Sequence, residues 1–375
     1  MADQPIQRDR DILLGRLALR RRLVRAPRLV EALLVQSSGG MKRPIGELLV
    51  ERGDLPAEKL NELLALQATA RRLEEDEEGP ESVAHGPNPD PRIGMVIKGV
   101  RIDTRIEYRP LWVTFAGRRA HDPEPVTLKL VDQAALRNGL WMDFLETIRA
   151  CVKVTSPNVT QILDVTRAEQ AFAIIARYNE GFSLQTLLDK VRRIRLAEAL
   201  RIAKEVAKGL RDLHKAGITH RAFRPGVVWL AKKGGVFVQD AGLAFEPVGV
   251  HKIAERGVIF GSPYHMAPEV AKGELADPRS DAYSLGCVLY EMLTGVRPFE
   301  GLGVADLLPQ QINDMPIPPT KYFSDVPTTV SDFVTRLMAK KKADRPTSDA
   351  IVSELETLEA AAPKNVTSVM KKIEG

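Results

Sequence analysis

Two charged side chains in this 375-residue chain have neighbours that suit a ligand site. Lys129 lies in the β-prone run Val126–Val131, and Asp240 follows the apolar run Val236–Val238 and precedes Ala241-Gly242. A lysine ammonium can pair with a phosphate, and an aspartate oxygen is the kind of ligand that magnesium prefers. Together they could hold one magnesium ion and a phosphate group; the alternative is that they are structural ion-pair residues.

The elements that must position these residues change in character along the chain. After Ile93 come short β-prone runs, at Val126–Val131 and Ala171–Ala176. From Leu196 to Ala216 apolar residues recur at helical spacing, and further helices are predicted over residues 284–294 and 330–339. Strands followed by helices indicate an α+β fold in two lobes, the first rich in strands and the second helical.

Five short motifs occur in an order that is typical of one family. They are His220-Arg221-Ala222-Phe223-Arg224-Pro225-Gly226-Val227, Asp240-Ala241-Gly242, and the segments 261–269, 280–286 and 343–347. In this order they resemble the catalytic loop, the D-F-G motif, the end of the activation segment, the start of the central helix and the late arginine motif of bacterial serine/threonine protein kinases. The resemblance covers roughly residues 93–360. It implies a bilobal protein-kinase-like fold, with a small β-rich N-lobe and a large helical C-lobe.

The resemblance also implies roles for single residues of the scaffold and the site. Glu269 is expected to pair with Arg345, and Asp281 to brace the backbone of the catalytic loop. The nucleotide and magnesium site of the family would be represented here by Lys129, Glu146 and Asp240, with Asp240 as the metal ligand.

Several features that phosphoryl transfer uses in this family are absent. Ala222 stands where an aspartate orients the acceptor hydroxyl, and Val227 where an asparagine binds the second magnesium. Residues 106–112, at the position of the glycine-rich loop, contain no glycine. No Ser, Thr or Tyr lies between Asp240 and Gly261 to be phosphorylated. The degenerate catalytic loop therefore comprises His220, Arg221, Ala222 and Val227, and we expect no intact catalytic set.

The first 70 residues contain an internal repeat. Residues 14–17 (Leu-Gly-Arg-Leu) recur 31 positions later as residues 45–48 (Ile-Gly-Glu-Leu). Each copy predicts two helices joined by a turn, and the two copies can bury apolar stripes, including Leu60, Leu63 and Leu64, against each other. The repeat resembles the MshEN-type domain of secretion and pilus ATPases, some of which bind cyclic di-GMP. The family's leading arginine is replaced by Leu13 and Pro44, which favours a helical interaction domain over a cyclic-dinucleotide sensor.

Composition divides the chain and excludes some functions. We expect a helical repeat domain at 11–70, an acidic and proline-rich linker at 71–92, the kinase-like domain at 93–360 and a tail at 361–375. A net charge of only +5, 5% aromatic residues and no zinc-binding Cys/His spacing argue against nucleic-acid binding. Two cysteines, no signal-peptide core and no apolar run long enough to span a membrane predict a cytoplasmic protein.

The motifs lead to three functional hypotheses. The first is a pseudokinase, a signalling scaffold or regulator that acts through protein partners with little or no phosphotransfer. The second is an ATP-dependent serine/threonine kinase or nucleotidyl transferase of unusual mechanism that uses Lys129 and Asp240. The third is a cyclic-dinucleotide sensor acting through the N-terminal repeat. The one cofactor that the pattern allows is weakly bound ATP, with or without magnesium.

Overall fold

The structure is a computed structural model. It describes residues 14, 23–24, 32, 43–64, 90–109, 112–120, 122–132, 141–168, 171–191, 193–244, 262–301 and 304–363. The chain forms two compact units, the first built mainly from residues 1–78 and the second containing the sheets and most of the helices. Within the described residues, no helix is both long enough and apolar enough to cross a membrane.

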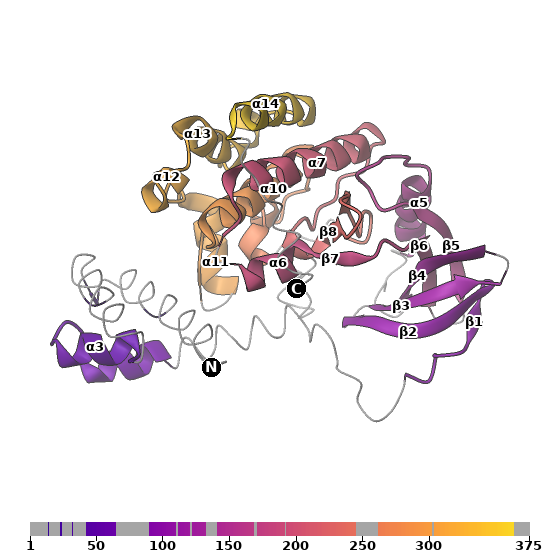
Figure 1. The fold of residues 1–375 in the computed structure, drawn as a ribbon, viewed down its shortest axis with the longest axis horizontal. Helices are drawn as coiled ribbons and strands as arrows, with labels where there is room; N and C mark the ends of the chain where they lie inside the picture. Colours follow the sequence, from indigo (N-terminus) through magenta and orange to yellow (C-terminus); the bar gives the residue numbers. More distant parts are fainter. Residues whose placement is uncertain are drawn as a thin grey trace. The chain divides into compact units, whose positions relative to one another are not determined.

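A six-stranded antiparallel sheet forms the first lobe of the second unit (Figure 1). Its strands are β1 (Val96–Ile97), β2 (Val100–Arg109), β3 (Trp112–Arg119), β4 (Asp122–Asp132), β5 (Ile162–Ala168) and β6 (Ala171–Arg177). They lie in the order β1-β2-β3-β4-β6-β5, so the central strand β4 pairs with β3 on one side and β6 on the other. Both strands predicted from the sequence are present, as β4 and β6.

The two faces of this sheet have different neighbours because side chains alternate along each strand. Leu128 and Leu130 of β4 pack with Phe115 of β3 in a core on one face. Val131 lies on the other face, where it packs with helix α5 (Trp141–Val152) through Phe144. Lys129 and Thr127 share the odd-numbered face of β4 with Val131. The alternation therefore directs the Lys129 ammonium toward the second lobe.

A small sheet begins the second lobe. It consists of β7 (Gly181–Ser183), β8 (Val228–Ala231) and β9 (Val236–Val238), hydrogen-bonded in that order. Strand β8 follows a short 3₁₀ turn, η2 (Pro225–Val227), and β9 leads directly to Asp240. The residues of the degenerate catalytic loop and Asp240 therefore lie at the ends of neighbouring strands.

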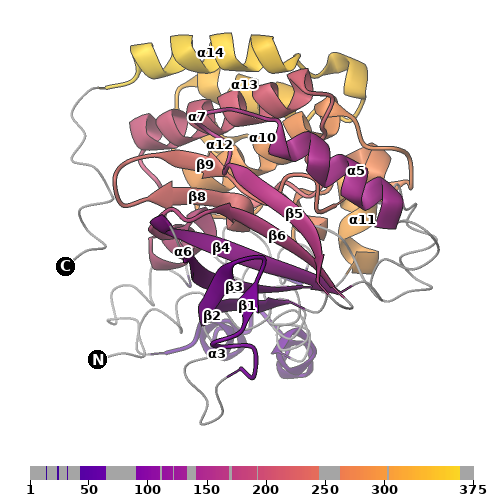
Figure 2. The same cartoon turned by 90° about the vertical axis from the view of Figure 1, so that its right-hand side faces the viewer.

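Helices complete the second lobe (Figure 2). They are α6 (Leu184–Lys190), α7 (Leu196–Lys215), α9 (Pro268–Ala271), α10 (Pro278–Thr294), α11 (Val304–Asn313), α12 (Pro319–Tyr322), α13 (Thr328–Leu337) and α14 (Ser348–Ala361), with 3₁₀ turns η3 (Pro263–His265) and η4 (Lys342–Asp344). Helix α10 is buried around most of its surface and packs against α7, α13 and α14, while α14 lies along α7. The predicted bilobal α+β fold is confirmed.

Helix α10 begins earlier than the sequence pattern predicts. The apolar run suggested a start near Ser284, but Asp277 caps the helix in a reciprocal capping box with Ser280, and Pro278 occupies the first turn. Gly295 ends the helix in the left-handed conformation, with φ of 70°. The polar first turn carries Asp281 into the core of the lobe.

The first unit is described mainly through the second copy of the repeat. Helix α3 (Ile45–Glu51) is followed by a turn in which Gly53 has φ of 71°, and by a helical segment at 57–64. Leu14 packs in one core with Ile45, Leu49, Leu55 and Leu63. The predicted apolar stripe is only partly buried, because Leu64 is 45% exposed.

Most of the first copy, the segment 65–89 and the tail from 364 onward lie outside the described residues. The proposed domain limits and both interpretations of the repeat, as an interaction domain or a cyclic di-GMP sensor, therefore stay predictions.

Gly46 provides a test of how this unit packs. A Cβ atom at this position would lie 2.5 Å from Leu60 Cδ1 and 3.0 Å from Leu14 Cδ2. We expect Gly46→Leu to destabilise the unit by about 1–3 kcal/mol, because the added side chain overpacks the core. Hydrogen exchange of the full chain should show faster exchange of amides 48–64. Glu47→Leu, which adds the same side chain at an exposed position, is the control and should leave exchange unchanged.

Candidate active site

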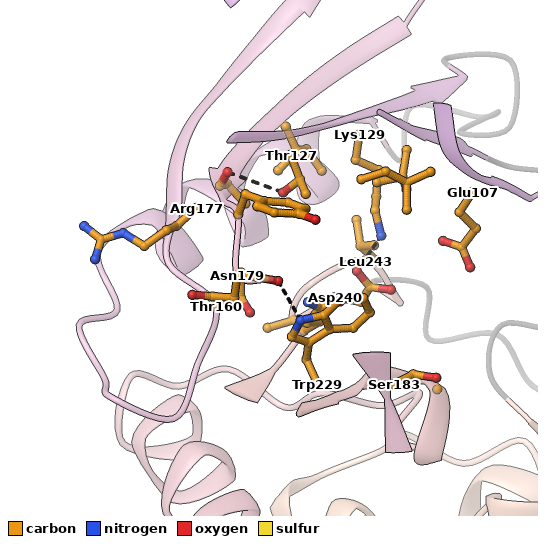
Figure 3. A pocket seen from close by; sticks show the side chains of 18 of the residues that line it. Glu107, Thr127, Lys129, Thr160, Arg177, Asn179, Ser183, Trp229, Asp240 and Leu243 are labelled. Atoms are coloured by element: carbon orange, nitrogen blue, oxygen red, sulfur yellow. Dashed lines mark hydrogen bonds and ion pairs between the residues drawn. The ribbon is translucent and has the colours of Figure 1, made fainter. Parts of the chain in front are cut away.

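A cavity of about 380 Å³ lies between the six-stranded sheet and the small sheet. Thr127 and Lys129 of β4 line one side, and Ser183 of β7 and Trp229 of β8 line the other (Figure 3). Asp240, just after β9, also lines it. The two lobes thus bring together residues that lie more than a hundred positions apart in the sequence.

The ion pair between Lys129 and Asp240 joins the two sides of the cavity. The Lys129 Nζ lies 2.5 Å from Asp240 Oδ1, and the two side chains are 13% and 22% exposed. Burial by itself opposes ionisation of Asp240, but the Lys129 ammonium, with help from Arg224, outweighs it and holds the pKa of this carboxyl below its usual value. The site therefore keeps a carboxylate beside a cation at neutral pH.

The backbone around Asp240 is held in an unusual conformation. Asp240 has φ of 61°, which is uncommon for a residue other than glycine. The preceding Gln239 fixes it, because its amide donates to the carbonyl of Val227 and its carbonyl accepts from His220 Nε2, each at 2.8 Å. Gly242 has φ of 80°, and a Cβ there would lie 2.8 Å from Cys151 Sγ of α5. The turn after Asp240 therefore packs tightly against α5.

Glu146 does not join this site. It is exposed on α5, whereas Phe144, Ile148 and Cys151 on the same helix are buried. At 100° per residue, Glu146 points away from the face that these three residues bury. Among the described residues, the carboxylate that pairs with Lys129 is that of Asp240, so the structure does not bring Glu146 into the site that the resemblance implied.

The catalytic-loop residues are held by one buried carboxylate. Asp281 is 1% exposed, and its oxygens accept from the amides of His220 at 2.7 Å and Arg221 at 2.9 Å. Arg221 has φ of 68°, so these bonds hold a second left-handed residue in place. Ala222 is half-buried, and Val227 is 3% exposed in the core of the helical lobe. The loop backbone is therefore held by Asp281, although the loop presents no carboxylate at position 222.

A second buried interaction in the helical lobe is the ion pair between Arg345 and Glu269. Arg345 donates to both oxygens of Glu269, at 2.7 and 2.8 Å, and Ser280 donates to one of them at 2.6 Å. Burial alone would raise the pKa of Glu269, but the bonds from Arg345 and Ser280 hold it below the usual value. The pair is almost inaccessible, with side-chain exposures of 0% for Arg345 and 3% for Glu269.

Sequence reasoning missed several residues that line the cavity. Arg224, within the loop motif at 220–227, lines the cavity, and its charge helps to lower the pKa of Asp240. Trp229 donates through Nε1 to the carbonyl of Asn179 at 2.8 Å. The hydroxyls of Thr114 and Thr160 are buried without a hydrogen-bond partner among the described residues. A signal for Trp229 did exist, since it is one of only three tryptophans and follows the loop motif directly.

Comparison with known proteins identifies the family. The model of the protein kinase domain matches residues 113–355. This chain belongs to the protein kinase domain family. The kinase domain is 33% identical over 232 residues to a probable serine/threonine-protein kinase of Clostridium perfringens, covering 62% of this chain and 33% of that protein. It is 29% identical over 212 residues to the serine/threonine-protein kinase PknB of Mycolicibacterium smegmatis, covering 55% and 34%.

The chain spans about a third of the length of these curated relatives. Among solved structures, the kinase domain of PknI from Mycobacterium tuberculosis superposes with a TM-score of 0.57 at 18% identity, covering 71% of this chain and 98% of that one. This likeness supports the bilobal fold.

The comparisons correct the leading functional hypothesis. The missing carboxylate at Ala222 and the valine at Val227 suggested a pseudokinase scaffold with little or no phosphotransfer. That prediction is wrong, because the relatives that this chain matches are named as serine/threonine protein kinases. They support the alternative, a kinase that uses Lys129 and Asp240. The physical reason for the error is that the prediction rested on the side chains at positions 222 and 227. It did not take into account the Lys129–Asp240 ion pair and the cavity, which the fold retains.

The oxygen ligands that the cavity offers suit a magnesium ion that is also bound by phosphate groups. Within the described residues, no cluster of three or more His, Cys, Asp or Glu side chains could hold a metal ion by itself. Asp240 offers one carboxylate beside the cavity, and magnesium is commonly bound through one or two carboxylates together with substrate phosphates. Asp240 therefore fits a nucleotide-bound ion, and Val227 supplies no second oxygen ligand.

The buried ion pair leads to a stability prediction. Arg345→Met leaves the Glu269 carboxylate buried without its partner, so we expect the free energy of unfolding at pH 7 to fall by about 3–5 kcal/mol. Arg336→Met, which breaks an ion pair with the partly exposed Glu354, should cost about 1 kcal/mol or less. Denaturant unfolding of both variants measures the difference, and equal losses would contradict the assignment.

The stability of the same variant is also expected to depend on pH. Because the pKa of Glu269 is lowered in the folded state, the native pair stabilises the protein above the usual glutamate pKa of about 4.3, and this stabilisation is lost as the pH falls further. In Arg345→Met, protonation relieves the buried carboxylate. The difference in the free energy of unfolding between the native protein and the variant should therefore become smaller as the pH decreases from 7 toward 4. A constant difference would show that Glu269 is not the titrating group.

Proposed function

We propose that this kinase domain binds ATP with magnesium in the cavity between its lobes and transfers a phosphoryl group to a serine or threonine. The observation that carries the proposal is the Lys129–Asp240 pair at the cavity, with a distance of 2.5 Å between its charged atoms. The names of the relatives support this substrate class, since they are serine/threonine protein kinases.

The proposal assigns electrostatic roles to the residues of the cavity. Lys129 would bind oxygens of the nucleotide phosphates, and Asp240 would hold the magnesium ion, which would supply positive charge to neutralise the phosphates. The Arg224 side chain also lines the cavity and adds positive charge on the side of the loop. Phosphoryl transfer depends mainly on positioning and charge stabilisation, and these three groups would contribute to both.

The reaction must proceed without a carboxylate at position 222. The acceptor hydroxyl oxygen forms a bond to the γ-phosphorus as the bond to the bridging oxygen of ADP breaks. The hydroxyl proton passes to a phosphoryl oxygen or to water. A loose transition state makes little demand on the nucleophile, so loss of the carboxylate slows the step but does not abolish it.

The proposal predicts that the chain binds ATP with magnesium. ATP with magnesium should raise the unfolding temperature of the full chain, with a stabilisation of about 2.7 kcal/mol at a ligand concentration one hundred times the dissociation constant. Asp240→Asn should remove the part of this shift that requires magnesium. Asp164→Asn, at an exposed position of β5, should leave it intact. Absence of any shift at millimolar ATP would overturn the proposal.

The proposal also predicts how the rate of phosphotransfer responds to a restored carboxylate. Ala222→Asp places a carboxylate on a loop whose backbone Asp281 already fixes, so we expect phosphotransfer to increase by about 100-fold or more. Ala216→Asp, at the exposed end of α7, is the control and should leave the rate unchanged. Transfer of label from γ-labelled but not α-labelled ATP distinguishes a kinase from a nucleotidyl transferase. If the native protein transfers neither label with magnesium or manganese, the proposed activity is ruled out.

A further inference from the structure

A row of hydrogen-bonded polar side chains runs through the helical lobe, away from the cavity. Lys340, just after α13, donates through Nζ to the hydroxyl of Tyr283 in α10 at 3.0 Å. The Tyr283 hydroxyl donates to Oε1 of Gln311 in α11 at 2.6 Å. Gln311 Nε2 then donates to the carbonyls of Pro263 and Tyr264 in η3, at 2.9 and 2.8 Å. Tyr283 and Gln311 are both 0% exposed, and none of these residues lines the cavity.

Lys340 sets the direction of the hydrogen bonds in this row. An ammonium group has donors only, so the Tyr283 oxygen accepts from Lys340 and its single proton is left for Gln311. Gln311 must then accept through its oxygen and present its NH₂ group to the two η3 carbonyls. A neutral amine can instead accept from Tyr283, which would leave the buried Gln311 oxygen without a donor. The charge state of Lys340 therefore decides whether Gln311 is fixed in the orientation that holds η3.

The Lys340 ammonium has favourable contacts on several sides. It also donates to the carbonyls of Gln311 and Gln310, at 2.8 and 3.3 Å, near the C-terminal end of α11. It lies 4.4 Å from the centre of the Phe299 ring and 5.2 Å from that of the Tyr283 ring. Carbonyls at the C-terminus of a helix and the faces of aromatic rings both attract a cation. The surroundings of Lys340 therefore suit its charged form.

Burial makes this charge sensitive to pH. It lowers the pKa of the Lys340 ammonium to about 8, and the charge of Arg345 acts in the same direction, whereas that of Asp314 opposes it. The other titratable neighbours are Tyr283 and Cys287, and burial raises the pKa of both, so they stay neutral near pH 8. A change near pH 8 in this part of the lobe would therefore be due to Lys340.

The turn that Gln311 holds lies beside the catalytic loop. Burial lowers the pKa of His265 in η3, and the charge of Arg224 contributes to this shift, as it does for Asp240. Arg224 also lines the cavity, so it is near both the cavity and η3. Under the proposed function, an acceptor side chain that reaches a phosphate in the cavity would therefore have η3 as a neighbour.

We propose that Lys340 is a positioning residue for phosphotransfer, which acts through Tyr283 and Gln311 to hold η3 in the place where the acceptor chain binds. The inference rests on the transfer to serine or threonine proposed above and adds a control on the acceptor side. With Lys340 charged, η3 is fixed and the acceptor binds well. With Lys340 neutral, η3 loosens and acceptor binding weakens, whereas nucleotide binding is unchanged because the row lies outside the cavity lining.

The experiment measures two Michaelis constants of the full chain, one for magnesium ATP and one for an acceptor. The acceptor is an N-acetylated serine peptide without His or Cys, chosen from a random-sequence library for transfer by the native chain. We expect Lys340→Met to raise KM for the peptide by about 10-fold and to leave KM for ATP unchanged, because buried acceptors of the row lose their donor. Gln311→Glu keeps the shape but cannot donate to η3, and it should have the same effect. Lys341→Met, at an exposed position, is the control and should change neither constant.

A pH profile distinguishes this role from a purely structural one. As the pH rises from 7 to 9, KM for the peptide should increase in the native chain and in Lys341→Met, but should stay high and constant in Lys340→Met. The folded-state pKa of Lys340 lies below the usual lysine value of about 10.4, so loss of its proton stabilises the folded chain between about pH 8 and 10.4. The melting temperature of the native chain, relative to that of Lys340→Met, should therefore not fall while acceptor binding weakens.

Hydrogen exchange of the full chain provides a measurement that does not depend on transfer. The amide of His265 donates to the carbonyl of Ser262 at 3.0 Å within η3. Its protection factor should fall in Lys340→Met and in Tyr283→Phe, and should stay at the native value in Lys341→Met. Tyr283→Phe keeps the buried ring and removes only the hydroxyl, so the row can still be tested if Gln311→Glu fails to fold.

The outcomes separate the two proposals. An unchanged peptide KM in Lys340→Met, or equal increases in KM for ATP and peptide, would overturn the role of Lys340 while phosphotransfer stands. An unchanged protection factor at His265 in Tyr283→Phe would overturn it as well. If the native chain transfers no label from γ-labelled ATP to any peptide of the library, the proposed function fails and the positioning role fails with it.

Discussion

The Asp281 carboxylate is the constraint on which the site depends. It is buried at the start of α10 and accepts hydrogen bonds from the amides of His220 and Arg221 and from the ring of His214. His220 in turn donates through Nε2 to the carbonyl of Gln239, the residue before Asp240. A continuous set of hydrogen bonds thus connects the central helix to the cavity. The residues at positions 222 and 227 leave this connection intact, because it runs through Asp281, His220 and backbone groups and uses neither of their side chains.

The ion pair between Lys129 and Asp240 is the corresponding link between the lobes. Lys129 belongs to β4 and Asp240 follows β9 of the small sheet, and neither side chain is fully buried. The opposite charges of such a pair favour the ionised form of each partner. The partners can also be exchanged: a phosphate can replace Asp240 beside Lys129, and a metal ion can replace Lys129 beside Asp240. The same contact therefore joins the two lobes and, under the proposed function, would provide the ligand groups for a nucleotide.

Motif residues were predictable from the sequence, and contact residues were not. Glu269, Arg345 and Asp281 lie in short segments whose order identifies the family, so their partners could be assigned before any coordinates were known. Glu146 was named from the resemblance, which does not tell the direction in which a side chain of α5 faces; the structure places it on the exposed face. Trp229 was missed because the hydrogen bond that holds its ring at the cavity goes to the carbonyl of Asn179, fifty positions earlier in the chain.

Strand β2 lies over the cavity through Ile106 and Glu107, and its pairing bears on the cost of binding a ligand there. It is ten residues long, pairs with β3 along most of that length, and carries two bulges, between Ile102 and Thr104 and between Arg105 and Glu107. A bulge leaves one residue unpaired and increases the local twist, while the residues on either side stay paired. Over its described residues this cover is therefore already a strand, so a ligand beneath it would have little backbone entropy to remove.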